Sequence, residues 1–208
     1  MFEDRTDAGR RLADLLVNRD VEVDVVLGIP RGALPVARPV ADAFDVPLDV
    51  VVASKIGAPS NPELAIGAAA SDGSAWLNED LIDRLGVPEE YVEREREREA
   101  ENARRKVERY RGDRPPLDLT DERVVVVDDG VATGATAKAC LRQVRAAGAS
   151  RVTLAVPVGS PETIADLADD ADEVIAVERP TNFRAVGQFY ERFDQVSDEE
   201  ATAYLDSE

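Results

Sequence analysis

The chain has 208 residues, of which 43 are acidic and 25 are basic, and its formal net charge is −18. A charge this negative argues against binding to nucleic acids or to anionic membrane surfaces, because both are polyanions. The chain has one cysteine and no histidine, which excludes an intrachain disulfide, a Ser-His-Asp triad, a Cys-His pair and a histidine metal site.

Hydrophobic periodicity predicts strands and helices that alternate along the chain. Such alternation indicates an α/β fold: a mostly parallel, twisted sheet with helices on both faces, in one domain over residues 1–208. No apolar run approaches the ~18 residues of a membrane span, and the N-terminus has no signal-peptide core, so we expect a cytoplasmic protein. The predicted elements are a helix at 7–18, a strand at 23–28, a helix ending near 44, a strand at 48–53, a loop at 55–62, small strands around a turn within 65–77, a short helix at 78–85, a long helix at 88–111, a strand at 124–127, a helix at 137–147, a strand at 151–156, a helix from 161 and a strand at 173–177.

The long helix includes a charge-dense segment, residues 91–112. Its arginines are mostly matched by glutamates three or four positions away, which is typical of a solvated helix and not of a basic patch for RNA. A dimer contact and a hinge are the alternatives for this segment.

Residues 124–136, VVVVDDGVATGAT, are the most informative stretch. Four valines read as a strand buried on both faces, and Asp128 and Asp129 follow where it ends. A loop of small and hydroxyl residues then leads into an alanine-rich helix. Valine runs that end in acidic residues are common in α/β proteins, and many such loops bind nothing. The spacing matches neither a Walker loop nor G-x-G-x-x-G.

This order of strand, loop and helix favours an anion site. The loop and the first helical turn leave backbone N–H groups without partners, and the helix dipole adds partial positive charge. Thr133 and Thr136 can add hydroxyl donors, and Gly134 lets the backbone come close to a phosphate. The acidic pair suits vicinal sugar hydroxyls, because carboxylates accept hydrogen bonds in a fork. We therefore infer a sugar phosphate as the ligand.

The stretch resembles the phosphoribosyl pyrophosphate (PRPP) motif of type I phosphoribosyltransferases, in which a hydrophobic strand, two acids and a T-G-x-T loop follow one another. The resemblance implies that fold, with a small hood from about residues 64–77 and 179–193. It implies that Asp128 and Asp129 hold the ribose hydroxyls. The residues that it assigns to the 5′-phosphate are Val131, Ala132, Thr133, Gly134, Ala135 and Thr136.

A second glycine-containing loop, GIPRGALP at residues 28–35, follows the first buried strand. Arg31 offers a planar charged fork suited to phosphate, although the motif alone is as compatible with a structural turn. Its place at the carboxyl edge of the same sheet favours ligand binding. In the resembling family a pyrophosphate loop occupies this place. The resemblance implies that Arg31 and Gly32 contact pyrophosphate and that the Pro30–Arg31 peptide is cis.

Lysine is rare in this chain, which has only Lys55, Lys106 and Lys138. Arginine over lysine with a large acidic surplus resembles proteins from high-salt cytoplasm, where salt screens self-repulsion. Lys55 follows the second buried strand and is either a surface lysine or a pyrophosphate contact, since family members commonly have a basic residue there. The loop after it, through about Ala69, is expected to be flexible enough to act as a lid.

The resemblance implies transfer of a phosphoribosyl group from PRPP to a nucleobase or similar small acceptor, as in nucleotide salvage, with release of pyrophosphate. Arg31 and Lys55 would stabilise the leaving group, and Asp128 and Asp129 would orient the ribose. Mg²⁺ is the expected cofactor, held mainly by PRPP and water near the two aspartates. A homodimer is expected from the family.

The acceptor is less defined by the sequence. Enzymes for 6-oxopurines have an aspartate at the position of Ala132, so hypoxanthine and guanine are disfavoured, and alanine there resembles adenine phosphoribosyltransferases. Phe183, Phe189 or Tyr190 could stack on a planar base or could belong to the core or to a dimer contact. Two other functions stay open: a PRPP-sensing regulatory protein without transferase activity, and a ribose-phosphate phosphorylase or hydrolase.

Overall fold

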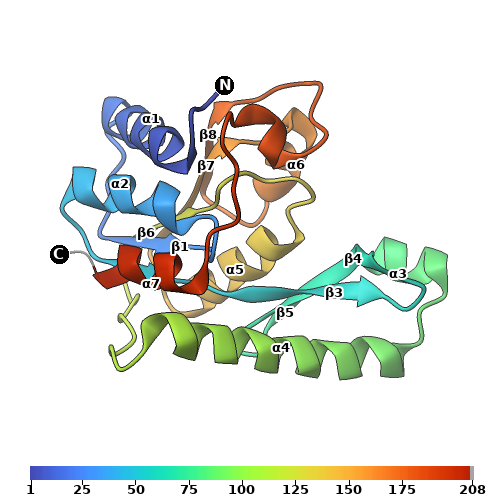
Figure 1. Cartoon of the computed structure of the whole chain (residues 1–208). Coiled ribbons are helices and arrows are strands. Elements are labelled where there is room, and N and C mark those ends of the chain that lie inside the picture. The colour runs from blue at the N-terminus through green and yellow to red at the C-terminus, as the bar shows by residue number, and fades with distance from the viewer. Residues whose placement is uncertain (207–208) are drawn as a thin grey trace.

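Short valine-rich runs form the middle of a parallel sheet in the computed structural model, which describes residues 1–206. The strands of this sheet are β1 (Val25–Gly28), β2 (Leu48–Val50), β6 (Arg123–Val127), β7 (Arg151–Val158) and β8 (Glu173–Glu178). The helices beside it are α1 (Arg5–Asn18), α2 (Leu34–Phe44), α5 (Ala135–Ala146) and α6 (Pro161–Leu167). The strands pair in the order β2-β1-β6-β7-β8, and every neighbouring pair is parallel. Helices lie on both faces (Figure 1), so the predicted α/β class is confirmed.

The valines of β6 alternate between two helical layers. Val125 and Val127 pack in the core that contains α1 and α2, whereas Val124 and Val126 pack in the core that contains α5. Successive side chains of a strand point to opposite faces, so a strand between two helical layers needs an unbroken apolar run. The acidic residues that end this run therefore stand at the sheet's carboxyl edge.

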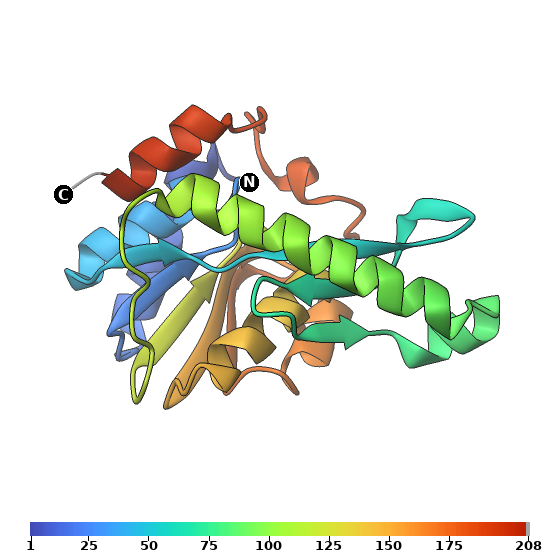
Figure 2. The ribbon, with the colours of Figure 1, turned by 90° about the horizontal axis from the view of Figure 1, so that it is seen from below.

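A second, three-stranded antiparallel sheet extends away from the first. Its strands are β3 (Ala53–Ala58), β4 (Asn61–Ala70) and β5 (Ala75–Leu77). The helices that follow it in the chain are α3 (Glu79–Leu85) and α4 (Glu89–Arg111). Residues 55–62, predicted as a loop, instead form part of the β3–β4 hairpin, so the prediction of a loop was wrong. Ile56 and Ile66 are fully buried in a core that includes Val92 of α4, which explains the strand pairing. Figure 2 shows α4 running along this sheet.

The boundaries of several predicted elements are confirmed closely. The turn between β4 and β5 contains Gly73 at φ +92°, and α3 and α4 begin one residue later than expected. The first helix begins at Arg5, two residues before the predicted start, because the Asp4 side chain accepts the Asp7 N–H at 2.9 Å. Within residues 1–206, every helix is too short or too polar to cross a lipid bilayer.

The C-terminal region contains two elements that the sequence did not predict, the 3₁₀ helix η1 (Val186–Phe189) and the helix α7 (Asp198–Asp206). Phe2 pairs with Tyr190, so the N-terminal residues lie beside the segment that follows β8. The segments expected to form a hood lie apart: residues 64–77 belong to the second sheet and α3–α4 layer, whereas residues 179–193 follow β8 of the first sheet.

We expect Gly9→Ala to destabilise the fold. A Cβ added at Gly9 would lie 2.5 Å from the carbonyl oxygen of Val36, at the contact between α1 and α2. Alanine favours an isolated helix over glycine by about 1 kcal/mol, but overpacking at this contact should lower the free energy of unfolding by about 1–3 kcal/mol. Urea unfolding measures the sign. Asp14→Ala, on the exposed side of the same helix, is the matched control, and a more stable Gly9→Ala protein would contradict the close packing.

Candidate functional site

Two loops meet at the carboxyl edge of the parallel sheet because β1 and β6 are neighbours. The loop after β1 contains Arg31 and Gly32, and the loop after β6 begins with Asp128 and Asp129. A Cβ added at Gly32 would collide with Oδ2 of Asp129, so the two loops touch and only glycine fits there. The peptide between Pro30 and Arg31 is cis, as predicted.

A cavity of about 690 Å³ opens at this meeting point. It draws residues from the N-terminal helix, both loops, the end of α4 and the C-terminal segment. Its lining consists of Arg5, Pro30, Arg31, Gly32, Lys106, Arg109, Tyr110, Asp129, Val186, Phe193, Gln195, Val196 and Asp198. Three of the predicted site residues, Arg31, Gly32 and Asp129, therefore face one cavity.

The two aspartates are held in a low-polarity setting. Asp129 presents its carboxylate to the cavity with a side chain 16% exposed, and Oδ1 of Asp128 accepts the Asp129 N–H at 2.8 Å. Burial raises the pKa of Asp128 well above its ordinary value, and the charge of Asp129 raises it further. Burial also raises the pKa of Asp129, although Arg5 opposes that shift.

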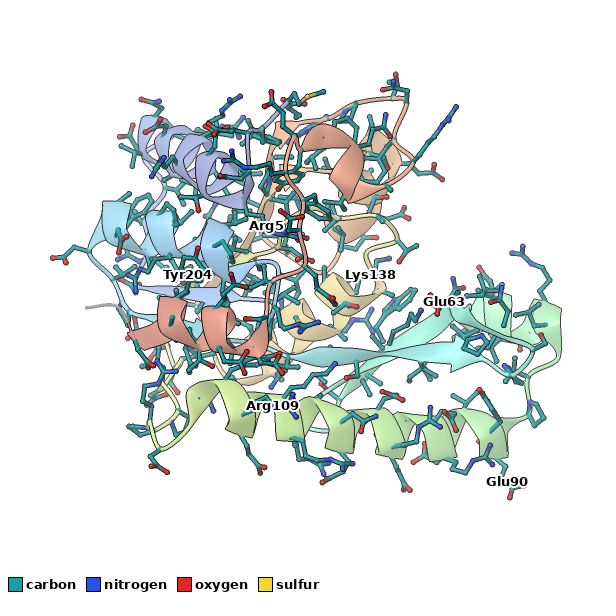
Figure 3. The ribbon with its side chains drawn as sticks, viewed as in Figure 1. Arg5, Glu63, Glu90, Arg109, Lys138 and Tyr204 are labelled. Atoms are coloured by element: carbon teal, nitrogen blue, oxygen red, sulfur yellow. The ribbon has the colours of Figure 1, made fainter. Side chains whose placement is uncertain are left out.

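Arg5 is a site residue that the sequence interpretation missed. Its Nε donates to Oδ2 of Asp129 at 2.8 Å, and its guanidinium lies 3.8 Å from the centre of the Phe193 ring. Another of its nitrogens donates to the carbonyl of Asp194 at 2.7 Å. Figure 3 shows Arg5 between the N-terminal helix and the chain that descends to α7. Arg5 and Asp129 are 124 positions apart, so no local pattern could reveal the contact.

The loop after the aspartates is open on one side. Val131 is buried and its N–H donates to the Val158 carbonyl, so its amide is already used. Ala132 and Thr133 are exposed, and the hydroxyl of Thr163 fixes the Ala132 carbonyl at 2.7 Å. Gly134 adopts φ +75° at the N-cap of α5. Within residues 1–206, the N–H groups from residue 132 to residue 137 have no hydrogen-bond acceptor.

A second cavity, of about 510 Å³, is lined in part by Ala132 and Thr133 of this loop. Hydroxyl groups are the most frequent polar groups in its lining, which also contains one arginine, one glutamate and one phenylalanine. The lining residues are Ala132, Thr133, Ser160, Pro161, Glu162, Thr163, Thr181, Phe183 and Arg184. The loop after β6 thus contributes to two cavities, with Asp129 in the first and Ala132 and Thr133 in the second.

Lys55 lies elsewhere than the sequence interpretation placed it. It stands within β3 opposite Ala68, and its Nζ is 3.1 Å from Oε2 of Glu63 at the start of β4. It lines neither of the two cavities. Lys106 and Arg109 of α4, which were assigned to a solvated helix, line the first cavity instead.

The three aromatic residues considered for base stacking are mostly used for packing. Phe189 and Tyr190 are buried with Phe2, and Phe183 stacks on Phe189 at a ring distance of 5.4 Å. Phe193 is 36% exposed and lines the first cavity. In the described part of the chain, no three His, Cys, Asp or Glu side chains cluster closely enough to hold a metal ion by themselves.

The chain is similar to known proteins in sequence and in fold. A family model for the phosphoribosyl transferase domain matches residues 3–194. A Mycobacterium tuberculosis H37Rv protein provisionally named a phosphoribosyl transferase is 45% identical over 206 residues, which cover 99% of this chain and 46% of that protein. The chain therefore spans about half the length of the curated relatives it matches.

Two solved structures share the fold. The crystal structure of the protein TT1426 from Thermus thermophilus aligns with a TM-score of 0.83 and 43% identity, over 99% of this chain and 97% of that one. A Neisseria gonorrhoeae protein crystallised with bound ppGpp aligns with a TM-score of 0.52, over 99% of this chain and 97% of that one. The two sequences are 15% identical, so this likeness shows the fold alone.

The raised pKa of Asp128 predicts a pH-dependent gain in stability for Asp128→Asn. A carboxyl group whose pKa is higher in the folded state stabilises the fold below its unfolded pKa, and this stabilisation is lost as the pH rises through the folded value. The ionised group therefore costs stability at pH 7.5. The substitution keeps the oxygen that accepts the Asp129 N–H. We expect an increase in Tm of roughly 2–4 °C, or ~1 kcal/mol for a chain of this size, at pH 7.5.

The gain should shrink as the pH falls toward 4. Asp83→Asn, on the exposed surface of α3, is the control and should show no gain at either pH. Differential scanning calorimetry across this range makes the comparison, and a lower Tm for Asp128→Asn at pH 7.5 would contradict the assigned cost.

Proposed function

Because the chain belongs to the phosphoribosyl transferase domain family, we propose that it transfers a phosphoribosyl group from PRPP to a nucleobase or similar small acceptor and releases pyrophosphate. The observation that carries the proposal is the meeting of two anion-type loops at one sheet edge. Gly32 of the first loop touches Asp129 of the second. A ligand with phosphates at both ends of a ribose matches that arrangement.

The loop after Asp129 is the proposed site of the 5′-phosphate. Its N–H groups from residue 132 to residue 137 have no acceptor within residues 1–206, and they stand at the N-terminus of α5. Backbone donors and a helix dipole together favour an anion. Thr133 and Thr136 can add hydroxyl donors. The amide of Val131 is excluded from this role because the Val158 carbonyl accepts its N–H.

The ribose is proposed to lie on Asp128 and Asp129. Of the two, Asp129 faces the cavity, and its carboxylate accepts one hydrogen bond, from Arg5. A carboxylate has further lone pairs for vicinal hydroxyls. Arg31 and Gly32 lie within the same cavity, on the side where the pyrophosphate would leave. Charge-assisted hydrogen bonds from Arg31 would stabilise the negative charge that develops there.

Mg²⁺ fits this site as an ion held mostly by the substrate. Asp128 and Asp129 are two carboxylates side by side, which is too few for an all-protein cage and suitable for an ion that keeps water and phosphate oxygens. When bound, the ion would neutralise charge on the pyrophosphate. The protein's part is to orient the ribose with the aspartates and to hold the leaving group with Arg31.

The second cavity is the proposed acceptor compartment. It includes Ala132 and Thr133, the first two residues of the proposed phosphate loop, and it contains the hydroxyls of Ser160, Thr163 and Thr181. Such donors and acceptors suit the polar edge of a base, and Phe183 supplies an apolar wall. Residues 179–193 are therefore proposed to cover the acceptor. Residues 64–77, which were expected to form part of the hood, have no role in this proposal.

Loss of the acidic pair should abolish ligand binding. We expect Asp128→Asn combined with Asp129→Asn to bind PRPP with Mg²⁺ at least ~100-fold more weakly, since two charge-assisted contacts are worth roughly 1.5–3 kcal/mol each. Isothermal titration measures the affinity, and Asp83→Asn is the surface control. Absence of heat from the unmodified protein at millimolar PRPP in high salt would refute the proposal. Binding without pyrophosphate release for any base in a screen would identify a PRPP sensor.

Lys55→Ala separates leaving-group contacts from ribose contacts. If Lys55 reaches the pyrophosphate when ligand is bound, turnover should fall about tenfold or more while ribose 5-phosphate binding stays within about twofold. Glu63→Gln is the matched control because it removes the partner of Lys55 and keeps the lysine. Equal losses of turnover and of ribose 5-phosphate affinity would contradict the role.

A further inference from the structure

The last turns of α4 differ from the rest of that helix. Along most of α4, arginines pair with glutamates of the same helix, as Arg96 does with Glu93 and Arg104 with Glu101. The bonded partners of Lys106 and Arg109 lie outside the helix. These two cations and Tyr110 occupy positions i, i+3 and i+4, which share one helix face, and all three line the first cavity.

The first cavity concentrates positive charge in a very acidic protein. Four cations line it, Arg5, Arg31, Lys106 and Arg109, against the two acids Asp129 and Asp198. The whole chain carries 43 acidic and 25 basic residues. A cationic lining in such a chain is unlike the surrounding surface, and field lines are focused in a cleft. The cavity therefore favours an anion, because its positive charge exceeds what its own two acids neutralise.

Asp198 occupies the point where the donors converge. Its Oδ2 is 2.7 Å from a guanidinium nitrogen of Arg109, and its Oδ1 accepts the Tyr110 hydroxyl at 2.8 Å. A nitrogen of Arg31 is 3.6 Å from the same Oδ1. Three donors from two separate elements thus surround one carboxylate, which belongs to the first turn of α7.

We propose that Arg109, Tyr110 and Lys106 form, with Arg31, a binding site for a phosphate-containing anion, and that the Asp198 carboxylate stands in for it. Phosphate oxygens are stronger acceptors than one carboxylate and can use the fork of each arginine. A cavity of about 690 Å³ accommodates more than one phosphoryl group. The ligand displaces Asp198, so α7 acts as an internal competitor for the site.

This inference rests on the proposed function only for the identity of the anion, which would be the pyrophosphate part of PRPP. Anion binding as such depends on the cations alone. Burial and the Asp198 charge raise the pKa of Tyr110 to about 12, so its hydroxyl keeps the proton that it donates. The hydrogen bond from Tyr110 lowers the pKa of Asp198, which keeps that carboxylate ionised as the competing anion.

Titration with inorganic pyrophosphate tests the site. We expect Arg109→Gln to weaken binding about tenfold, as loss of one charge-assisted contact should. Asp198→Asn should tighten binding several-fold, because it removes the competing charge and keeps an oxygen for Tyr110 and Arg109. Arg105→Gln is the matched control: Arg105 lies on the same helix, is 64% exposed and does not line the cavity, so affinity should stay within about twofold.

Each outcome decides one question. Equal pyrophosphate affinity in Arg109→Gln and Arg105→Gln would overturn the site, and so would an Asp198→Asn protein that binds no tighter than the unmodified chain. Arg109 is 62% exposed, so its substitution does not disturb the core, and thermal unfolding of each variant checks this. If these effects appear but PRPP does not bind, the anion site stands and the proposed function fails. If PRPP binds and depends on the aspartates but not on Arg109, the function stands and this site fails.

Discussion

Parallel pairing of β1 with β6 is the constraint on which the candidate site depends. Parallel strands put their carboxyl ends at one edge, so the loop that contains Arg31 and the loop that starts at Asp128 must emerge side by side. Contact between Gly32 and Asp129 then leaves no room for a larger side chain. The valine run of β6 supports this arrangement, because it is buried between two helical layers and a shift of its register would carry the flanking Arg123 or Asp128 into them.

Charge balance at Asp129 links the N-terminal helix and the segment after β8 to that edge. A buried carboxylate pair is unfavourable unless a cation compensates it, and Arg5 supplies that cation from the first turn of α1. Phe193 stacks on the same guanidinium, and Tyr190 donates its hydroxyl to the Asp129 carbonyl at 2.6 Å. The terminal segments are thus part of the site's electrostatics, and the acids keep their place at a cost in stability that binding a ribose would offset.

Sequence patterns predicted the features of the structure that are determined by residues close together in the chain. The valine run, the glycine at the start of α5 and the cis peptide beside Arg31 follow from strand burial, from backbone geometry and from a family resemblance. Contacts between distant segments could not be predicted in this way. Arg5 and Asp198 reach the cavity through the positions of α1 and α7, which only the packed fold defines. The β3–β4 hairpin was mistaken for a loop because its glycines and prolines outweighed Ile56 and Ile66, whose burial against α4 decides the structure.

The loop from Asp129 to Thr133 contributes residues to two cavities of different character, and this bears on the proposed chemistry. The cavity that Asp129 lines also contains Arg31 and Arg109, whereas the cavity that Ala132 and Thr133 line contains hydroxyl groups and Phe183. An in-line displacement with inversion needs the leaving group and the incoming acceptor on opposite sides of the reacting carbon. If the ribose lies on Asp129, the leaving pyrophosphate would face the cations and the acceptor would approach from the hydroxyl-lined side. The shape of this one loop, fixed by the Val131 amide and the Ala132 carbonyl, would then set the direction of the displacement.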